Sequence, residues 1–595
     1  MHTWKSVGEN RSRGPIAVDR SIFKKSTGLA IFIIVAVQMV IAQGQNAENA
    51  NSSGVAQSDA STAEETYKPP KIPFSVSWDT TFKYSPIFRV AKQSIELSAP
   101  VTPNNNNINQ NDGDLNFHRG LVSNRVDVFS ELDVNFNGNY GVRASTAAWA
   151  NPIYNQHTAN ALAPHFPEGT KDLEFRKVEL MDAFFHGKTD WAGGALTFKG
   201  GQFAQVWGQT LFMGYNGIAG GMAPSDIIKA NSEPNVEFKE LIRPVPQVTA
   251  QWQRHNLSIG AYYQFEFQPS RLPTVGSYFS NADVIGDGAE YFYMGPTTPP
   301  LTLAKDVWAK DWDQYGAQVL IKLPHEFDLG FYGIVFHDKG PQLVLEGALV
   351  PNESGPPSVT FPYFARVYQE GIKSLGVSVT KTQGVINWAL EVSGRINQDL
   401  AVPSSVTMAP PGFSPSARNA PYPVGDTIHA NLSAFASNMK PNKLARESSL
   451  LVEVAYNNVL SVTKNRALWE SSGSNKPGAL ALQALYTLSY DQVRPNLNLD
   501  IPLGLTFDPI GKSALGPVGN FAAYHGGTVN FGLTATYRDK NKFGITYQRY
   551  VGDQMGAIAS NPTPHYSYGQ SLGDRNYIAL SINRSFGVRA SKKSH

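Results

Sequence analysis

Charged residues of both signs alternate within one segment, 204–244, and such a set can bind or sort charged molecules. The set comprises Asp226, Lys229, Glu237, Lys239, Glu240 and Arg243. Pro224-Ser225-Asp226 has the pattern of a helix start, with Ser225 as the cap. Inside a passage, opposed charges on a folded segment would narrow the opening and set its selectivity. If the segment is an external lid, these charges would be solvated. The sequence is compatible with both a segment inside a passage and an external lid.

A second group of charges recurs at odd-numbered positions and comprises Arg125, Asp127, Glu131, Asp133 and Arg143. Side chains alternate across a strand, so residues at even spacing share one face. The group therefore predicts either charges that line an interior path or a network of salt bridges within a wall.

Motifs for enzymatic chemistry are absent from the sequence. It contains no G-x-S-x-G elbow and no H-E-x-x-H, and Gly511-Lys512-Ser513 lacks the upstream glycine of a phosphate loop. The histidines fall mostly in turns and loops and lack the spacing of metal ligands. Asp112 and Asp114, like Asp283 and Asp287, could contact calcium, but we interpret them as solvated loop carboxylates. We therefore expect no enzyme, no cofactor and no metal site.

The elements that must position these charges are strands, because apolar and polar residues alternate along the chain. In one example, Val529, Phe531, Leu533 and Tyr537 alternate with Thr528, Asn530, Thr534 and Thr536. About eighteen strands are expected, two of them in a hairpin over 246–268; the other candidates are Phe74–Phe82, Arg125–Phe136, Tyr140–Trp149, Glu174–Phe185, Ala195–Phe203, Gln314–Leu323, Phe327–His337, Lys373–Thr380, Val385–Gly394, Thr427–Ala436, Ser449–Tyr456, Leu482–Tyr490, Leu497–Phe507, Thr528–Arg538, Phe543–Tyr550 and Asn576–Phe586.

The hairpin over residues 246–268 has an apolar face and a polar face on each arm. A two-residue turn at Arg254-His255 would place Trp252 across from Leu257. The two apolar faces would then coincide without a slip in register.

Short and long connections alternate along the chain. The long ones occupy about 84–123, 150–172, 204–244, 268–311, 338–371, 395–426, 461–480, 508–525 and 552–574. Outer-membrane barrels show this asymmetry, and a closed barrel is the only sheet that can span lipid. We therefore predict an all-β, transmembrane, antiparallel up-and-down β-barrel of about eighteen strands, with short periplasmic turns and long extracellular loops.

Composition and the chain ends suit this fold. Charged residues are 16% of the chain, cysteine is absent and the net charge is +2, so no nucleic-acid partner is indicated. Basic residues precede the apolar run Leu29–Ala42, which predicts a cleaved signal peptide over 1–42, with an uncleaved membrane anchor as the alternative. We expect a disordered linker over 43–72, the barrel over 73–588 and a short basic tail over 589–595.

Residues 231–288 carry a more specific signal. NVEFKELIRPVPQVTAQ, and then YYQFEFQPSRLPTVGSYFSNADVIGDG, resembles a proteobacterial outer-membrane family of unassigned function with the patterns "PGAELKEALLPVP" and "YQxEWxPTRxDPxGSYFSxxD". The similar positions are Glu237, Lys239, Glu240, Pro244, Pro246, Tyr263, Gln264, Glu266, Pro269, Arg271, Gly276, Ser277, Tyr278, Phe279, Ser280 and Asp283. GGQFAQVWGQT from Gly200 departs from the family's "GRQxxNWGES". The resemblance implies a porin-type barrel and the uptake of apolar or aromatic small molecules.

These patterns together predict a porin-like channel of the bacterial outer membrane for passive uptake of small solutes. The first charged set would form the constriction and the second would line the lumen. The partners would be outer-membrane lipid, the barrel-assembly machinery and the solute, and an oligomer is compatible with the sequence. The alternative is a closed barrel that binds and transfers hydrophobic ligands without open-pore conductance.

Overall fold

The computed structural model describes residues 74–102, 106–234, 236–294, 299–351, 358–402, 406–409, 411–413, 419–439, 444–470, 478–559 and 565–592. The expected signal peptide over 1–42 and linker over 43–72 lie outside these residues. Within the described part of the chain, no helix has the length and hydropathy needed to cross a membrane.

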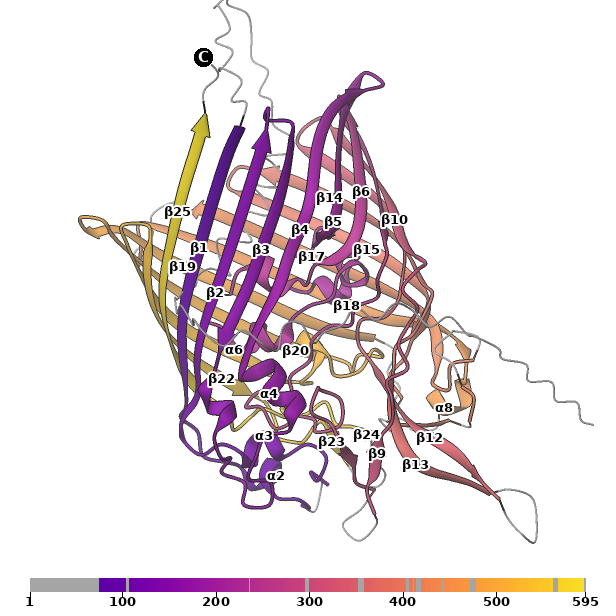
Figure 1. The fold of residues 1–595 in the computed structure, drawn as a ribbon. Coiled ribbons are helices and arrows are strands. Elements are labelled where there is room, and N and C mark those ends of the chain that lie inside the picture. The colour runs from indigo at the N-terminus through magenta and orange to yellow at the C-terminus, as the bar shows by residue number, and fades with distance from the viewer. Residues whose placement is uncertain are drawn as a thin grey trace, which may run out of the picture. The chain divides into compact units, whose positions relative to one another are not determined.

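Eighteen strands of the described residues form one closed antiparallel ring, drawn in Figure 1. Each pairs with the next strand of the ring, and the last pairs with the first along nearly its whole length. The predicted fold, an antiparallel up-and-down barrel of about eighteen strands, is confirmed. The strands are β1 (Phe74–Arg89), β2 (Gly120–Phe136), β3 (Tyr140–Ala150), β4 (Arg176–Trp191), β5 (Gly194–Phe203), β6 (Val245–Arg254), β7 (Leu257–Gln264), β10 (Gln314–Leu323), β11 (Phe327–Phe336), β14 (Ile372–Gln383), β15 (Ile386–Asp399), β17 (Val424–Met439), β18 (Glu447–Lys464), β19 (Gly478–Arg494), β20 (Leu497–Ile510), β21 (Gly527–Tyr537), β22 (Asn541–Val551) and β25 (Tyr577–Lys592).

The alternating sequence gives the barrel an apolar outer face and a polar inner face. On β21, Val529, Phe531 and Leu533 point outward and are 45%, 53% and 39% exposed. Large aromatic side chains gather on the outer face near the short turns, as they do at the interface girdles of membrane barrels. They include Trp78, Phe136, Tyr140, Trp191, Tyr537 and Phe543.

The hairpin of β6 and β7 differs from its predicted register. Arg254 pairs with Leu257 and Trp252 with Ile259, so the two-residue turn is His255-Asn256 rather than Arg254-His255. His255 has a φ of 51°, a left-handed conformation that such tight hairpin turns require. The partner of Trp252 is Ile259 instead of the predicted Leu257, a difference of two residues. Because side chains alternate along a strand, Trp252 still shares its face with apolar residues and Gln251 still points inward.

The two strands that close the barrel are longer than predicted. β1 continues to Arg89 instead of ending at Phe82, and β25 continues to Lys592, into the expected tail over 589–595. Phe74 pairs with both Phe136 and Lys592, so the added length is hydrogen-bonded on both sides. Backbone groups of each strand are satisfied only if its partner extends equally far.

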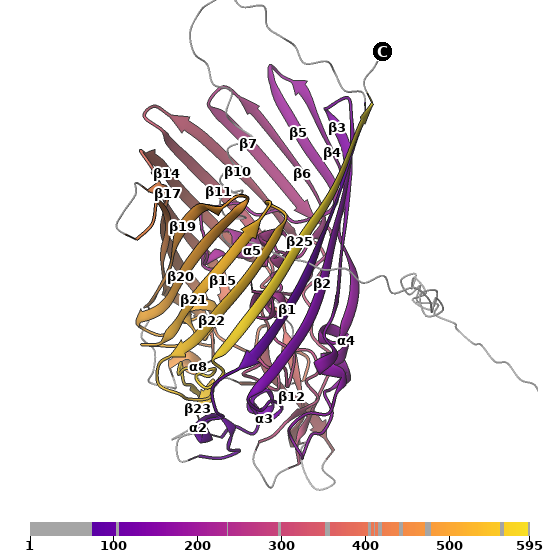
Figure 2. The same cartoon turned by 90° about the vertical axis from the view of Figure 1, so that its left-hand side faces the viewer.

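Apart from residues 204–244, the long connections gather at the end of the barrel opposite the short turns (Figures 1 and 2). They hold a second sheet of β8 (Tyr291–Phe292), β9 (Leu301–Leu303), β12 (Gln342–Val350), β13 (Ser358–Val367) and β16 (Thr407–Ala409), and the pair β23 (Ile558–Ala559) and β24 (His565–Tyr566). The helices α2 (Ile95–Ser98), α3 (Asp112–Leu115), α4 (Glu168–Glu174) and α8 (Arg466–Glu470) also belong to these connections.

Candidate functional site

The connection between β5 and β6, residues 204–244, folds into short helices. In its described residues these are a 3-10 turn at Gly214–Asn216, α5 (Ala219–Met222), α6 (Ile227–Ser232) and α7 (Phe238–Leu241). We call this connection the inner loop. Asp226 caps α6, because its Oδ1 accepts a hydrogen bond from the backbone of Lys229 at 3.0 Å. The predicted cap, Ser225, is wrong: Ser225 instead forms a β-bridge with Ile242.

Ion pairs fasten one side of the inner loop to β1 and β2. The ammonium of Lys83 lies 2.8 Å from Glu233 and 2.5 Å from Glu240. Arg125 lies 2.7 Å from Asp127 on its own strand and 3.1 Å from Glu233. All five side chains are at most 4% exposed, so the loop is tied to the wall by a dry cluster of charges.

Carboxylates fasten the other side of the inner loop to β15 and β18. Glu391 accepts hydrogen bonds from the backbone of Gln209 at 2.6 Å and of Ile218 at 2.7 Å. Glu453 accepts from the backbone of Phe212 at 2.5 Å and of Met213 at 2.8 Å. Hydrogen bonds of amides to a carboxylate are stronger than neutral ones.

The two fastened sides lie across the barrel from each other. In the ring of eighteen strands, β2 and β15 are nine steps apart in either direction. Between them, Trp207, Ile218 and Met222 of the inner loop pack in one cluster with inward-facing side chains of β7, β11 and β14. The inner loop therefore crosses the interior of the barrel instead of covering its mouth as a lid.

Three members of the second predicted group, Glu131, Asp133 and Arg143, lie where α7 meets β2 and β3, whereas Arg125 and Asp127 belong to the dry cluster. Lys239 is ion-paired with Glu131 and lies 3.0 Å from Glu237. Arg143 is paired with Glu131 and lies 3.4 Å from Asp133. Arg143, Lys239 and Glu237 remain 28%, 39% and 24% exposed, so this cluster faces open space in the interior.

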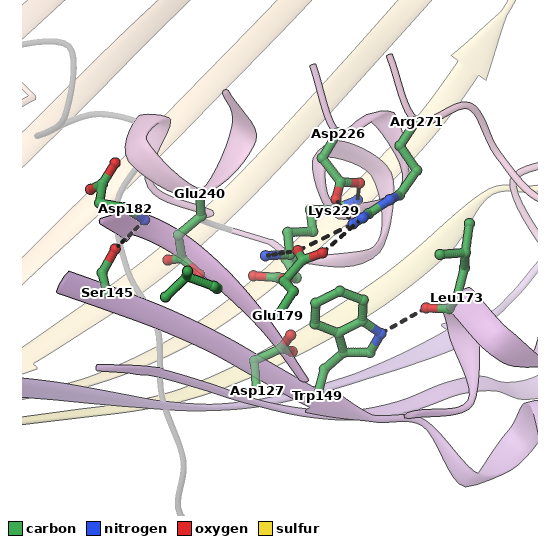
Figure 3. A network of polar contacts seen from close by, with 12 residues as sticks. Asp127, Ser145, Trp149, Leu173, Glu179, Asp182, Asp226, Lys229, Glu240 and Arg271 are labelled. Atoms are coloured by element: carbon green, nitrogen blue, oxygen red, sulfur yellow. Dashed lines mark hydrogen bonds and ion pairs between the residues drawn. The ribbon is translucent and has the colours of Figure 1, made fainter. Parts of the chain in front are cut away.

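A third cluster surrounds the indole of Trp149 on β3 (Figure 3). Arg271 lies 2.6 Å from Asp226 and 2.8 Å from Glu179. The charged ends of Arg125, Lys229 and Arg271 lie 5.0, 4.9 and 5.7 Å from the indole ring, within the range of cation–π contacts. Asp226 and Lys229 therefore position α6 against the wall.

Arg243 stands apart from the other members of the first charged set. Its guanidinium donates to the carbonyl of Pro269 at 2.8 Å, and no carboxylate of the described residues lies within ion-pair distance. Burial and the nearby Arg271 lower the pKa of Arg243. The structure thus divides the first set: Asp226, Lys229 and Glu240 are buried, whereas Glu237, Lys239 and Arg243 are partly exposed.

The charge state of the dry cluster follows from its partners. Burial opposes ionisation of Glu233, but Lys83 and Arg125 outweigh it and lower the pKa of Glu233 to about 2. Burial raises the pKa of Glu240, and Lys83 offsets this only in part. One ammonium therefore serves two carboxylates of unequal acidity.

Sequence reasoning missed several residues that hold the inner loop, namely Lys83, Glu233, Glu391 and Glu453. Lys83 fell one residue beyond the predicted end of the first strand. Glu391 and Glu453 lie in predicted strands, on inward faces whose neighbouring residues are uncharged: Ala389 and Ser393 beside Glu391, and Leu451 and Ala455 beside Glu453. A carboxylate on an inward face needs a partner, and that requirement is the signal that could have singled them out.

The interpretation of Asp112, Asp114 and Asp283 as solvated is wrong. Asp114 and Asp283 are 0% and 7% exposed, and Asp112 is half-buried between long connections. Asp287 is solvent-exposed, with 51% of its side chain accessible, as predicted. In the described ranges, no group of three or more His, Cys, Asp or Glu side chains is arranged to hold a metal ion.

The closed barrel, its apolar exterior and its folded internal segment define this protein as a transmembrane-type β-barrel with an internal loop. Its family follows from the sequence match. Residues 27–586 match the family DUF1302, described as a protein of unknown function, and the chain belongs to that family. No curated protein sequence matches the chain significantly.

Solved barrels share a distant likeness with the chain. A BenF-like porin from Pseudomonas fluorescens Pf-5 is 7% identical, with 87% of this chain and 99% of that chain covered and a TM-score of 0.40. OccAB1 from Acinetobacter baumannii is 11% identical, with coverage of 86% and 97% and a TM-score of 0.39. OpdK from Pseudomonas aeruginosa, solved with vanillate, is 8% identical, with coverage of 87% and 99% and a TM-score of 0.37.

Proposed function

We propose that this protein is an outer-membrane channel through which small solutes diffuse passively, and that the inner loop is its constriction. The observation that carries the proposal is the inner loop held across a polar barrel interior between β2 and β15. Barrels of sixteen to eighteen strands are wide enough for an aqueous path, so a fixed internal segment would set the width of that path.

The outer membrane is the environment that the barrel surface fits. The outward apolar band and the aromatic side chains near the short turns suit lipid and its interface. Short turns would then face the periplasm and the long connections the exterior. Lipid, the barrel-assembly machinery and a cleaved signal peptide belong to this proposal, and it involves no chemical change of the solute.

The cluster of Glu131, Asp133, Arg143, Glu237 and Lys239 would select among solutes. Its partly exposed charges of both signs would favour solutes that carry a charged group over neutral ones of the same size. The family resemblance adds an expectation of apolar or aromatic solutes. A small aromatic molecule with one charged group would satisfy both.

Ion selectivity in planar bilayers tests the proposal. Purified protein should give stepwise conductance, and Lys239→Glu should shift the reversal potential in a salt gradient towards cation selectivity. Lys171→Glu is the matched control, because Lys171 lies in the connection after β3 and, among the residues that the structure describes, forms an ion pair only with Glu168, at 2.7 Å. Absence of conductance, or equal shifts in the two variants, would count against a channel with this constriction.

A second candidate function is transfer of hydrophobic ligands by a closed barrel. The observation in its favour is an apolar hollow of about 390 Å³ on the outer wall, lined by Phe331, Leu375, Val377 and Val392. Growth on a long-chain fatty acid that requires the protein, together with negligible conductance, would favour this candidate over the channel.

A further inference from the structure

The connections after β1 and β7 meet at an unusually close contact at the long-loop end of the barrel. On α3, a Cβ added to Gly113 would clash with the carbonyl oxygen of Ser277 and would lie 2.7 Å from that of Ser280. The backbone N–H of Asp112 donates to Oδ2 of Asp283 at 3.2 Å. Two segments more than 160 residues apart are thus held backbone to backbone, and Asp112 and Asp283 lie at their junction.

The carboxylates around this junction outnumber the cations. Arg89 lies 2.6 Å from Asp114 and 3.1 Å from Asp574, and both carboxylates are nearly fully buried. Arg575 donates to the carbonyl of Tyr278 at 2.7 Å, and its Nε lies 3.9 Å from Asp114. Arg89 therefore pairs with both Asp114 and Asp574, and Arg575 lies within ion-pair distance of Asp114. Among the described residues, no cation lies within ion-pair distance of Asp112 or Asp283.

Three residues of the two connections that meet at this junction carry buried side-chain oxygens without a hydrogen-bond partner. Oδ1 of Asp283, a residue 7% exposed, is buried and has no partner. The same holds for Oδ1 of Asn116 and Oγ of Ser277, whose residues are 6% and 2% exposed. Asn116 is fixed here because its Nδ2 donates to the carbonyl of Gly276 at 2.9 Å. Buried acceptors without donors are unfavourable unless something else meets them.

We propose that Asp112 and Asp283 bind a divalent cation, Ca²⁺ by its chemistry, and that the cation clamps the connection after β1 to the connection after β7. A charge of +2 would balance the two unpaired carboxylates. Every available donor atom is an oxygen, which suits a hard cation, and Ca²⁺ tolerates irregular shells of carboxylate, carbonyl and amide oxygens. The proposed site has only two carboxylates, so it differs from the groups of three or more His, Cys, Asp or Glu side chains considered above.

A shared proton is the competing explanation for two adjacent carboxylates. One proton would remove the repulsion between Asp112 and Asp283, but it would not supply partners for the buried oxygens of Asn116 and Ser277. The two explanations differ in what they require from solution, since only the first needs a metal ion.

Calorimetric titration of the full-length, folded protein with CaCl₂ after EDTA treatment tests the proposal. We expect one Ca²⁺ per chain with a Kd of about 10⁻⁴ to 10⁻³ M, as in extracellular calcium modules, and weaker binding of MgCl₂. Asp283→Asn and Asp112→Asn should each weaken Ca²⁺ binding at least tenfold. Glu168→Gln is the matched control, because Glu168 is an exposed carboxylate in the neighbouring connection, and it should bind as the wild type does.

A heat-modifiable gel shift identifies the folded variants, and Asp112→Asn keeps the test valid if Asp283→Asn fails to fold, since Asp112 is only half-buried. Binding of no Ca²⁺ by the wild type at millimolar concentration would overturn the proposal, as would unchanged binding by both variants. A variant that is more stable than the wild type with EDTA present, while the wild type binds no Ca²⁺, would assign the pair to a shared proton. None of these outcomes depends on whether the barrel conducts.

Discussion

At the scale of single residues, one buried ammonium holds the inner loop to the first strands of the barrel. Lys83 contacts Glu233 and Glu240, and Arg125 adds a second cation on Glu233. Removing one partner of such a group leaves an uncompensated buried charge, which costs about 3–5 kcal/mol. The geometry therefore makes the position of α6 and α7 depend on the ionisation of Glu233.

The pH dependence of the inner loop's protection from proteolysis should follow the ionisation of Glu233. Its pKa of about 2 lies below the ordinary value of 4.5, so its contribution to stability is complete above pH 4.5 and is lost as the pH falls towards 2. Protection of residues 204–244 from an acid-active protease should decline over that range in the wild type. Glu240, whose pKa is raised, contributes with the opposite sign, so the comparison with Glu233→Gln isolates Glu233.

Glu233→Gln should lower protection above pH 4.5 and remove the part of the decline that Glu233 causes. Glu168→Gln, at an exposed carboxylate, should retain the wild-type profile. Identical profiles for the wild type and Glu233→Gln would show that the ion pair does not hold the loop.

Residue types and spacing predicted the two charged groups, but not the partners of each charge. The even spacing of Arg125, Asp127, Glu131 and Asp133 placed them correctly on one inward face. Lys83 and Glu233 are far apart in the sequence, and no local pattern links them. Burial of Asp283 depends on packing between distant connections, so its sequence neighbours suggested a solvated loop.

At the scale of elements, the inner loop depends on two wall carboxylates as much as on its own helices. Glu391 and Glu453 each accept two backbone N–H groups from residues 209–218. The helices α5, α6 and α7 have only four to six residues each, too few to be stable alone. Contacts with the wall must therefore fix the course of the loop.

Removing a wall carboxylate should loosen the inner loop and widen the channel. Each hydrogen bond to a charged group contributes about 1.5–3 kcal/mol, so Glu391→Ala or Glu453→Ala removes two such bonds. Single-channel recordings should show higher conductance and more current noise, with Glu391→Gln in between because its amide oxygen still accepts. Asp500→Ala is the control, since Asp500 accepts from Ser489 on the wall itself. Unchanged recordings for both alanine variants would contradict this role.

Strand positions were predictable because alternation is a local property, whereas register and loop placement were not. All eighteen barrel strands overlap their predicted ranges. The hairpin register was missed because both candidate turns keep the apolar faces together, and only the backbone pairing of Arg254 with Leu257 distinguishes them. The sequence of residues 204–244 is equally compatible with a lid and with a loop inside the barrel.

At the scale of the whole molecule, the two faces of the barrel suit two solvents, since the apolar outer face suits lipid and the polar inner face suits water. Phe531 and Thr534 are two positions on the same strand, β21. The side chain of Phe531 lies on the outer face of the barrel and that of Thr534 on the inner face. Phe531→Arg should destabilise the barrel by about 2–4 kcal/mol in a bilayer, whereas Thr534→Arg should be tolerated. Folding into lipid vesicles, read by heat-modifiable migration on gels, would measure both. A folded Phe531→Arg beside an unfolded Thr534→Arg would reverse the assignment of faces.

Thiol labelling during single-channel recording tests the central claim, that the inner loop lines the conducting path. The chain contains no cysteine, so Lys239→Cys introduces one thiol at a position where the side chain is 39% exposed. A bulky cationic methanethiosulfonate should reduce the current through this variant irreversibly. The same reagent should leave Lys171→Cys, in the connection after β3, at its original current. Labelling of Lys239→Cys, verified by mass, without a change in current would contradict the account.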